Sequence, residues 1–135
     1  AALDEGVTVI AAHAGASGHL HPVEFFDGYV RMLGEYPNLY GDLSALSNFS
    51  RFGYARRMVH TPGFAERHMQ ATDYPVTPLP LLYTGQLPAR KTFQLSLVKN
   101  FFDRDVQAKL ALGFPPSILE TGAKVLGLHG DGGRG

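Results

Sequence analysis

The chain of 135 residues carries 12 basic and 12 acidic side chains, so its formal net charge is zero. This balance argues against nucleic acid or an anionic membrane as a partner, because both attract a basic protein face. Hydrophobic residues make up 44% of the chain and charged residues 18%, as in globular domains, and the absence of cysteine excludes disulfides and thiolate zinc sites.

Hydrophobic periodicity divides the chain into strands and helices. The predicted elements, in chain order, are a strand at 7–12, a helix at 22–35, a strand at 39–43, a helix at 51–59, a strand at 66–72 and helices at 91–102, 104–112 and 117–126. Strands that alternate with helices are typical of parallel βαβ units. We therefore expect an α/β fold of about three parallel strands with flanking helices and C-terminal helices.

Glycine, proline and polar caps set the expected boundaries. Gly6 ends a helix before the first strand, which we expect to be buried, and Pro22 lies in the first turn of the next helix. Asp103 caps the helix that Gly113 ends, and Gly127 ends the last one. Two helices are expected to bury one apolar stripe each, formed by Val23, Phe26, Val30 and Leu33 in the first and by Phe93, Leu97 and Phe101 in the other.

Two segments predict loops. Residues 74–88 contain four prolines and predict a long loop, and the glycine-rich residues 129–135 predict a flexible tail after a domain at 1–128. The sequence contains neither G-x-G-x-x-G nor a P-loop, which argues against a nucleotide site. Because no apolar run approaches a membrane span and no signal peptide begins the sequence, we expect a cytoplasmic protein without a membrane partner.

A polar side chain lies at the C-terminal end of each predicted strand, namely His13, Asp42 and Asp73. They are 29 and 31 residues apart, close to the length of about 30 residues of one βαβ unit. The carboxyl ends of parallel strands open on one side of a sheet, where α/β folds place their chemistry. We therefore expect the three side chains to converge there.

Each of these residues has a functional and a structural interpretation. His13 can orient a carbonyl, accept a proton or bind a metal, or it can be a buried histidine bonded to the backbone. Asp73 can bind a metal and accept a proton, because a carboxylate leaving a buried strand needs compensation, or it can close a turn before Pro75. Asp42, with Ser44, is a weaker candidate for the substrate site, since strand-end aspartates commonly bond to the local backbone.

Other basic side chains carry weaker signals. His19-Leu20-His21 has a metal-ligand spacing, but it lies in a predicted loop, where polar loop contacts are at least equally expected. His60 and His68 have no partner that the sequence identifies. Arg56-Arg57 predicts a solvated helix face unless it meets an anionic substrate.

Three segments, in chain order, resemble the amidohydrolase superfamily. They are Val9-Ile10-Ala11-Ala12-His13-Ala14-Gly15, Asn38-Leu39-Tyr40-Gly41-Asp42-Leu43-Ser44 and Ala71-Thr72-Asp73-Tyr74-Pro75. The most similar branch is that of the amidohydrolase-related metal-dependent hydrolases of TIM-barrel fold, which includes nonoxidative decarboxylases. The C-terminal helices, from Phe102 to Leu128, are also similar to this branch.

The resemblance implies that residues 1–128 are the C-terminal portion of a (β/α)8 TIM barrel, with its sixth, seventh and eighth strands. His13 would match the family's active-site histidine after strand six, and Asp73 its metal-binding aspartate after strand eight. The implied cofactor is a single divalent metal ion, zinc or manganese. The family's H-x-H of strand one and its histidine of strand five would precede Ala1.

A barrel takes about 250 residues, so three strands cannot close one. The chain also does not begin with Met, and we expect an incomplete fragment that binds metal weakly and does not turn over. Three strands would leave two sheet edges exposed, which favours association with a second copy, as a homo-oligomer, or with the remainder of a longer chain.

The leading hypothesis is a metal-dependent hydrolase that cleaves a C–N or C–O bond of a small polar substrate. Asp73 would bind the metal and act as base, and His13 would be a second ligand or would stabilise charge on the carbonyl oxygen. One alternative is a nonoxidative decarboxylase of the same superfamily, which would use the same residues. The other is a non-catalytic α/β fragment in which His13 and Asp73 are structural.

Overall fold

The computed structural model describes residues 1–18, 23–51 and 53–128. These residues form an α/β structure with three parallel strands and five α-helices, which confirms the expected α/β class with a parallel sheet. The elements, with 3-10 turns written as η, are β1 (Val9–Ala11), η1 (Ala12–Gly15), α1 (Phe26–Glu35), β2 (Leu39–Asp42), η2 (Phe49–Arg51), α2 (Tyr54–Val59), η3 (Ala65–Arg67), β3 (His68–Met69), η4 (Pro80–Tyr83), α3 (Ala89–Ser96), α4 (Phe101–Ala111) and α5 (Ile118–Val125).

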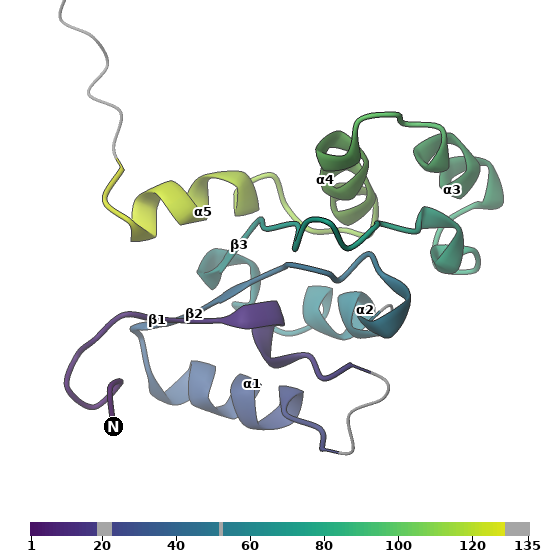
Figure 1. Cartoon of the computed structure of the whole chain (residues 1–135). Helices are drawn as coiled ribbons and strands as arrows, with labels where there is room; N and C mark the ends of the chain where they lie inside the picture. The colour runs from purple at the N-terminus through teal and green to yellow at the C-terminus, as the bar shows by residue number, and fades with distance from the viewer. Residues whose placement is uncertain (19–22, 52, 129–135) are drawn as a thin grey trace, which may run out of the picture.

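The sheet has the strand order β1–β2–β3 and is parallel throughout. Val9 pairs with Leu39, and Gly41 pairs with His68. In Figure 1, α1 and α2 lie on one side of the sheet, whereas α3, α4 and α5 lie on the other. Because the strands are parallel, their carboxyl ends lie at the same edge of the sheet.

One apolar cluster packs the helices against the sheet. Helix α1 buries Phe26 and Leu33 of the predicted stripe and packs the partly buried Val30 against the core, whereas Val23 precedes the helix and is exposed. The helix also buries Tyr29, which the stripe did not include. The central strand β2 buries Leu39. Other buried members of the cluster are Leu43, Leu46, Met58, Phe64, Tyr83, Phe114 and Ile118.

The edges of the sheet differ from the prediction. Ile10 and Val7 are exposed because β1 lies at an edge, and the helix expected before Gly6 is a series of turns. At the opposite edge the backbone N–H of Gln70 donates to the carbonyl of Ile118 at 2.9 Å. The beginning of α5 therefore covers an edge that we expected to be exposed.

The helix predicted at 91–102 is two helices in the structure. The chain leaves the helical conformation after Ser96, and α4 begins beyond Asn100, whose Oδ1 accepts the backbone N–H groups of Phe102 and Asp103 at 2.9 and 3.1 Å. Asn100 is thus the cap that we assigned to Asp103. Gly113 and Gly127 follow α4 and α5 with positive φ angles of 106° and 66°, as predicted.

The apolar face predicted for this helical segment is wrong. Phe93 and Leu97 are exposed, whereas Thr92 and Leu95 are buried. Helix α3 packs against η4, and it turns Thr92 towards Thr84, with the two hydroxyl oxygens 3.4 Å apart. Apart from η4, residues 74–88 form the predicted loop.

None of the described helices combines the length and hydropathy that crossing a bilayer requires. Strand β3 is much shorter than predicted, because only His68 and Met69 pair with β2. The predicted tail at 129–135 and the His19-Leu20-His21 spacing lie outside the described residues.

Candidate active site at the strand ends

Polar residues come together where the three strands end. His13 lies in η1 directly after β1, Asp42 is the last residue of β2, and Asp73 lies four residues beyond the end of β3. Hydrogen bonds and close approaches join these three residues with Ser44, as we expected from their spacing. We call these four residues, His13, Asp42, Ser44 and Asp73, the rim.

Asp42 holds the rim together through one carboxylate oxygen. Its Oδ1 accepts the backbone N–H groups of His13 at 2.9 Å and Ser44 at 3.0 Å, and it also accepts the hydroxyl of Ser44. Three donors to one anionic oxygen fix the loops after β1 and β2 relative to each other. The predicted contact of Asp42 and Ser44 with substrate stays a prediction, and their observed bonds are made within the rim.

Two rim residues have left-handed backbone conformations. The φ angle is 56° at His13 and 63° at Asp73. Such a conformation costs roughly 1–2 kcal/mol for most residues, although histidine and aspartate adopt it more readily than others. Gly15 is needed in the same turn, because its φ is 69° and a Cβ there would lie 2.6 Å from the Cβ of Tyr29. The turn packs closely on α1 and places the His13 ring next to Ser44 and Asp73, which follow β2 and β3.

The tautomer of His13 follows from its neighbours. Its Nδ1 lies 2.7 Å from Ser44 Oγ. Because the Ser44 hydroxyl donates its own proton to Asp42, the Ser44 oxygen accepts from Nδ1–H. The neutral ring therefore presents an Nε2 lone pair, and Ser44 is not arranged as a nucleophile activated by this histidine.

The carboxylate of Asp73 faces that lone pair. Asp73 Oδ2 lies 4.0 Å from His13 Nε2, and the side chains are 41% and 24% exposed. Within the described part of the chain, no hydrogen-bond donor contacts the Asp73 carboxylate. Two acceptors in this position can share a proton on Nε2, a metal ion, or a water molecule that donates to both.

The facing pair would have to move closer to bind one divalent ion. Zinc binds imidazole nitrogen and carboxylate oxygen at about 2.0–2.2 Å in a tetrahedral arrangement, which places two ligand atoms roughly 3.4 Å apart, whereas Nε2 and Oδ2 are 4.0 Å apart. Catalytic zinc sites take three protein ligands. The described residues contain no group of three or more His, Asp or Glu side chains that could hold an ion. His13 and Asp73 are thus fewer than the three ligands that such a site takes.

His68, which has no partner readable from the sequence, has two in the structure. Its Nδ1 donates to the carbonyl of Phe64, so the Tyr29 hydroxyl donates to Nε2, at 2.6 Å. The ring stacks on that of Phe64 with centroids 3.3 Å apart. Burial lowers the pKa of His68 to about 4. This histidine is therefore neutral, and its role is structural.

A buried ion pair connects α4 to the segments that follow β2 and β3. Lys109 and Asp105 lie one turn apart on α4 and are at most 1% exposed. Lys109 Nζ donates to Asp105 Oδ2 and to the carbonyl of Ala71, both at 2.7 Å. Asp105 also accepts from Gln70 Nε2 at 2.6 Å and from the hydroxyl of Ser47. The pair thus ties α4 to the segment after β3 and to the loop after β2.

Burial lowers the pKa of Lys109, and the adjacent Asp105 carboxylate opposes that shift. We did not anticipate this pair. Its signal in the sequence is the i, i+4 spacing of an acid and a base, which by default indicates an exposed helix face.

The remaining basic candidates do not contact the rim through any described side chain. His60 Nδ1 lies 2.7 Å from the carbonyl of Arg56. Arg57 forms ion pairs with Glu24 at 3.6 Å and Asp27 at 2.5 Å.

Comparison of the chain with known proteins identifies no relative. No family model, no curated protein and no solved structure matches the chain significantly. The functional interpretation of the rim therefore depends on its geometry and on the segments that resemble the amidohydrolase superfamily.

Proposed function

We propose that the chain is the C-terminal part of an amidohydrolase-type (β/α)8 barrel whose rim belongs to a metal-dependent hydrolase site. The observation that carries the proposal is the approach of His13 Nε2 to Asp73 Oδ2, because the two residues follow non-adjacent strands. Asp42 and Ser44 support it, since they hold the tautomer that leaves the Nε2 lone pair open. Metal-binding histidines usually donate their other N–H group in this way.

Each rim residue has its own role in the proposal. His13 Nε2 and Asp73 would hold the divalent ion, zinc or manganese, which when bound supplies Lewis acidity and lowers the pKa of a water. The second oxygen of Asp73 accepts a proton from the attacking water. When its ring is protonated, His13 instead donates Nε2–H to the charge that develops on the substrate carbonyl oxygen. Asp42 and Ser44 position the ring.

The reaction that we propose is cleavage of a C–N or C–O bond in a small polar substrate. A nonoxidative decarboxylation would use the same groups and remains the alternative reaction. The products separate the two, because hydrolysis releases an amine or alcohol and decarboxylation releases carbon dioxide.

Zinc titration of the chain tests the metal site. Asparagine is the best replacement at positions 13 and 73, because it accepts a left-handed backbone, and at position 13 it keeps an N–H group for Ser44 while removing Nε2. We expect weak zinc binding by calorimetry and at least tenfold weaker binding in His13→Asn and in Asp73→Asn. His60→Asn removes an exposed histidine elsewhere and should leave the affinity unchanged. Equal affinity in all four proteins would reject the site.

The partial donor set has a consequence for turnover. We expect no hydrolysis by the 135-residue chain alone. A longer chain, in which the segment before Ala1 supplies an H-x-H strand and a further strand-end histidine, should hydrolyse its substrate. In that longer chain Asp73→Asn should lower kcat by roughly 10²–10⁴-fold. Stoichiometric zinc and hydrolase activity in the short chain would contradict the fragment proposal.

A further inference from the structure

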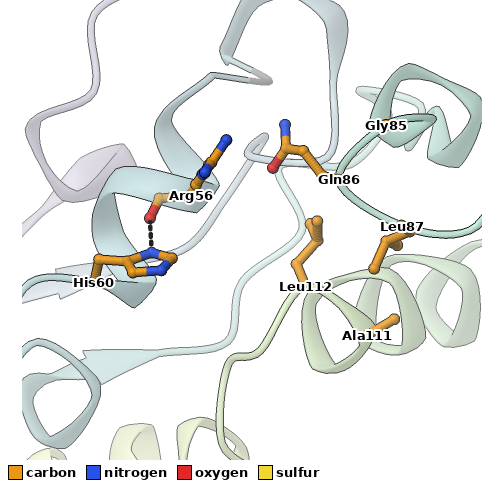
Figure 2. A pocket seen from close by; sticks show the side chains of 7 residues that line it. All are labelled: Arg56, His60, Gly85, Gln86, Leu87, Ala111 and Leu112. Atoms are coloured by element: carbon orange, nitrogen blue, oxygen red, sulfur yellow. Dashed lines mark hydrogen bonds between the residues drawn. The ribbon is translucent and has the colours of Figure 1, made fainter.

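A second candidate binding site lies in a cavity between α2, the loop before α3, and the end of α4 (Figure 2). Its volume is about 260 Å³. Three polar residues, Arg56, His60 and Gln86, and three apolar ones, Leu87, Ala111 and Leu112, line it. The cavity shares no residue with the rim, so its function is independent of the proposed hydrolase site.

The polar end of the cavity is positively charged. Figure 2 shows the side chains of Arg56 and Gln86 next to each other. Within the described part of the chain, Arg56 has no ion-pair partner, whereas the neighbouring Arg57 is paired with carboxylates. No carboxylate is among the described residues that line the cavity. The guanidinium and amide N–H groups therefore favour an anion.

The C-terminus of α2 does not cancel this preference. Unpaired carbonyls at the end of a helix form its negative pole and would repel an anion. Here the Arg56 carbonyl accepts from His60 Nδ1 at 2.7 Å, the bond drawn in Figure 2, and the Arg57 carbonyl accepts from Thr61 Oγ1 at 3.0 Å. These bonds occupy last-turn carbonyls and weaken the negative pole beside the cavity.

The other end of the cavity is aliphatic. Leu87, Ala111 and Leu112 are partly buried, so a ligand that covers them removes apolar surface from water. The volume of about 260 Å³ lies just below the range of about 300–1,000 Å³ that is typical of small-molecule pockets, which suits a small ligand. Inorganic phosphate would leave the aliphatic end unused.

We propose that this cavity binds a small aliphatic carboxylate. The carboxylate accepts from Arg56 and Gln86, and the alkyl chain covers Leu87, Ala111 and Leu112.

Hexanoate is the probe for this site, with hexanamide as its neutral isostere and acetate as the anion without an alkyl chain. In an NMR titration, hexanoate should shift the methyl signals of the three aliphatic lining residues. Arg56→Gln should weaken hexanoate binding at least tenfold, since a hydrogen bond to a charged group is lost. Arg31→Ala removes an exposed charge on α1 and should not change the affinity.

Hexanamide and acetate should each bind at least tenfold more weakly than hexanoate. Equal binding of hexanamide would contradict an anion site, and equal binding of acetate would contradict the aliphatic end. Hexanoate shifts confined to other parts of the protein would also overturn the proposal. Gln86→Ala is a second variant at an exposed loop position and should weaken binding severalfold, so the test does not depend on the folding of Arg56→Gln alone.

Discussion

The rim and the interior of the protein use the same side chains in opposite ways. In the interior, both ring nitrogens of His68 have hydrogen-bond partners, and burial keeps the ring neutral. At the rim, Nδ1 of His13 has a partner, while Nε2 faces the Asp73 carboxylate across 4.0 Å. A structural histidine therefore differs from one that can bind a ligand in whether both of its ring nitrogens have hydrogen-bond partners.

The carboxylates show the same contrast. Asp105 is buried and accepts from a lysine, an amide and a hydroxyl. Asp73 is partly exposed, and its carboxylate has no donor among the described residues. Changes in the interior should therefore lower the free energy of unfolding, whereas removal of the Asp73 carboxylate without a change of shape should alter ligand binding and leave stability nearly unchanged.

Lys109→Met should have the largest effect on stability. Removing one partner leaves the Asp105 charge buried without compensation, which costs roughly 3–5 kcal/mol of unfolding free energy. Chemical denaturation measures this loss. Lys124→Met is the matched control, because Lys124 pairs with Glu120 at 3.0 Å with the same i, i+4 spacing on an exposed helix face. The control should change stability by less than about 0.5 kcal/mol, and a similar small loss for Lys109→Met would refute the buried-pair interpretation.

His68 should make stability depend on pH. Its pKa is about 4 in the folded protein against 6.5 for an unperturbed histidine. Between these values the unfolded chain binds a proton that the folded chain does not, so stability falls as the pH decreases from 6.5 to 4 and His68 causes no further loss below 4. A shift of this size corresponds to about 3 kcal/mol.

The unfolding free energy at pH 7.5, 5.5 and 4.0 measures this dependence. His68→Gln should lose most of the wild-type slope over this range, and His60→Gln, at an exposed position, should keep it. An unchanged slope in His68→Gln would show that other groups cause the acid sensitivity.

Gly41→Ala should have the next largest effect. A Cβ at position 41 would collide with the Tyr29 hydroxyl and lie 2.8 Å from His68 Cδ2, which disturbs a buried hydrogen bond. We expect a loss of about 1–3 kcal/mol, typical of overpacking. Gly34→Ala is the control, because a Cβ there meets nothing within 4 Å and α1 gains helix propensity. It should stabilise the protein by roughly 0.5–1 kcal/mol. The same Gly→Ala substitution should thus lower the free energy of unfolding at position 41 and raise it at position 34.

Local patterns predicted much of the fold and the meeting of the rim residues. The βα repeat length placed His13, Asp42 and Asp73 at equivalent strand ends, and strand geometry then brought them together. The tautomer of His13 was not predictable, because it depends on Ser44 and on the hydroxyl proton that Ser44 donates to Asp42.

Contacts between distant segments account for what the sequence patterns missed. The buried face of α3 is set by η4, so Thr92 is buried in place of Phe93. The burial of Lys109 depends on Ala71, 38 residues away. Such partners leave no periodic signal along the chain.

Asp73→Asn should have the smallest effect on stability and the clearest effect on binding. Asparagine has nearly the same shape as aspartate and tolerates the left-handed backbone, with a φ of 63° at this position, so the free energy of unfolding should change by less than about 0.5 kcal/mol. Asp73→Ala removes the same carboxylate but places alanine in that conformation, at a cost of roughly 1–2 kcal/mol. If both variants lose zinc binding while only alanine lowers stability, then the carboxylate serves the ligand and the backbone geometry serves the fold. A stability loss of more than about 2 kcal/mol in Asp73→Asn would instead assign Asp73 to the structural class of Asp105.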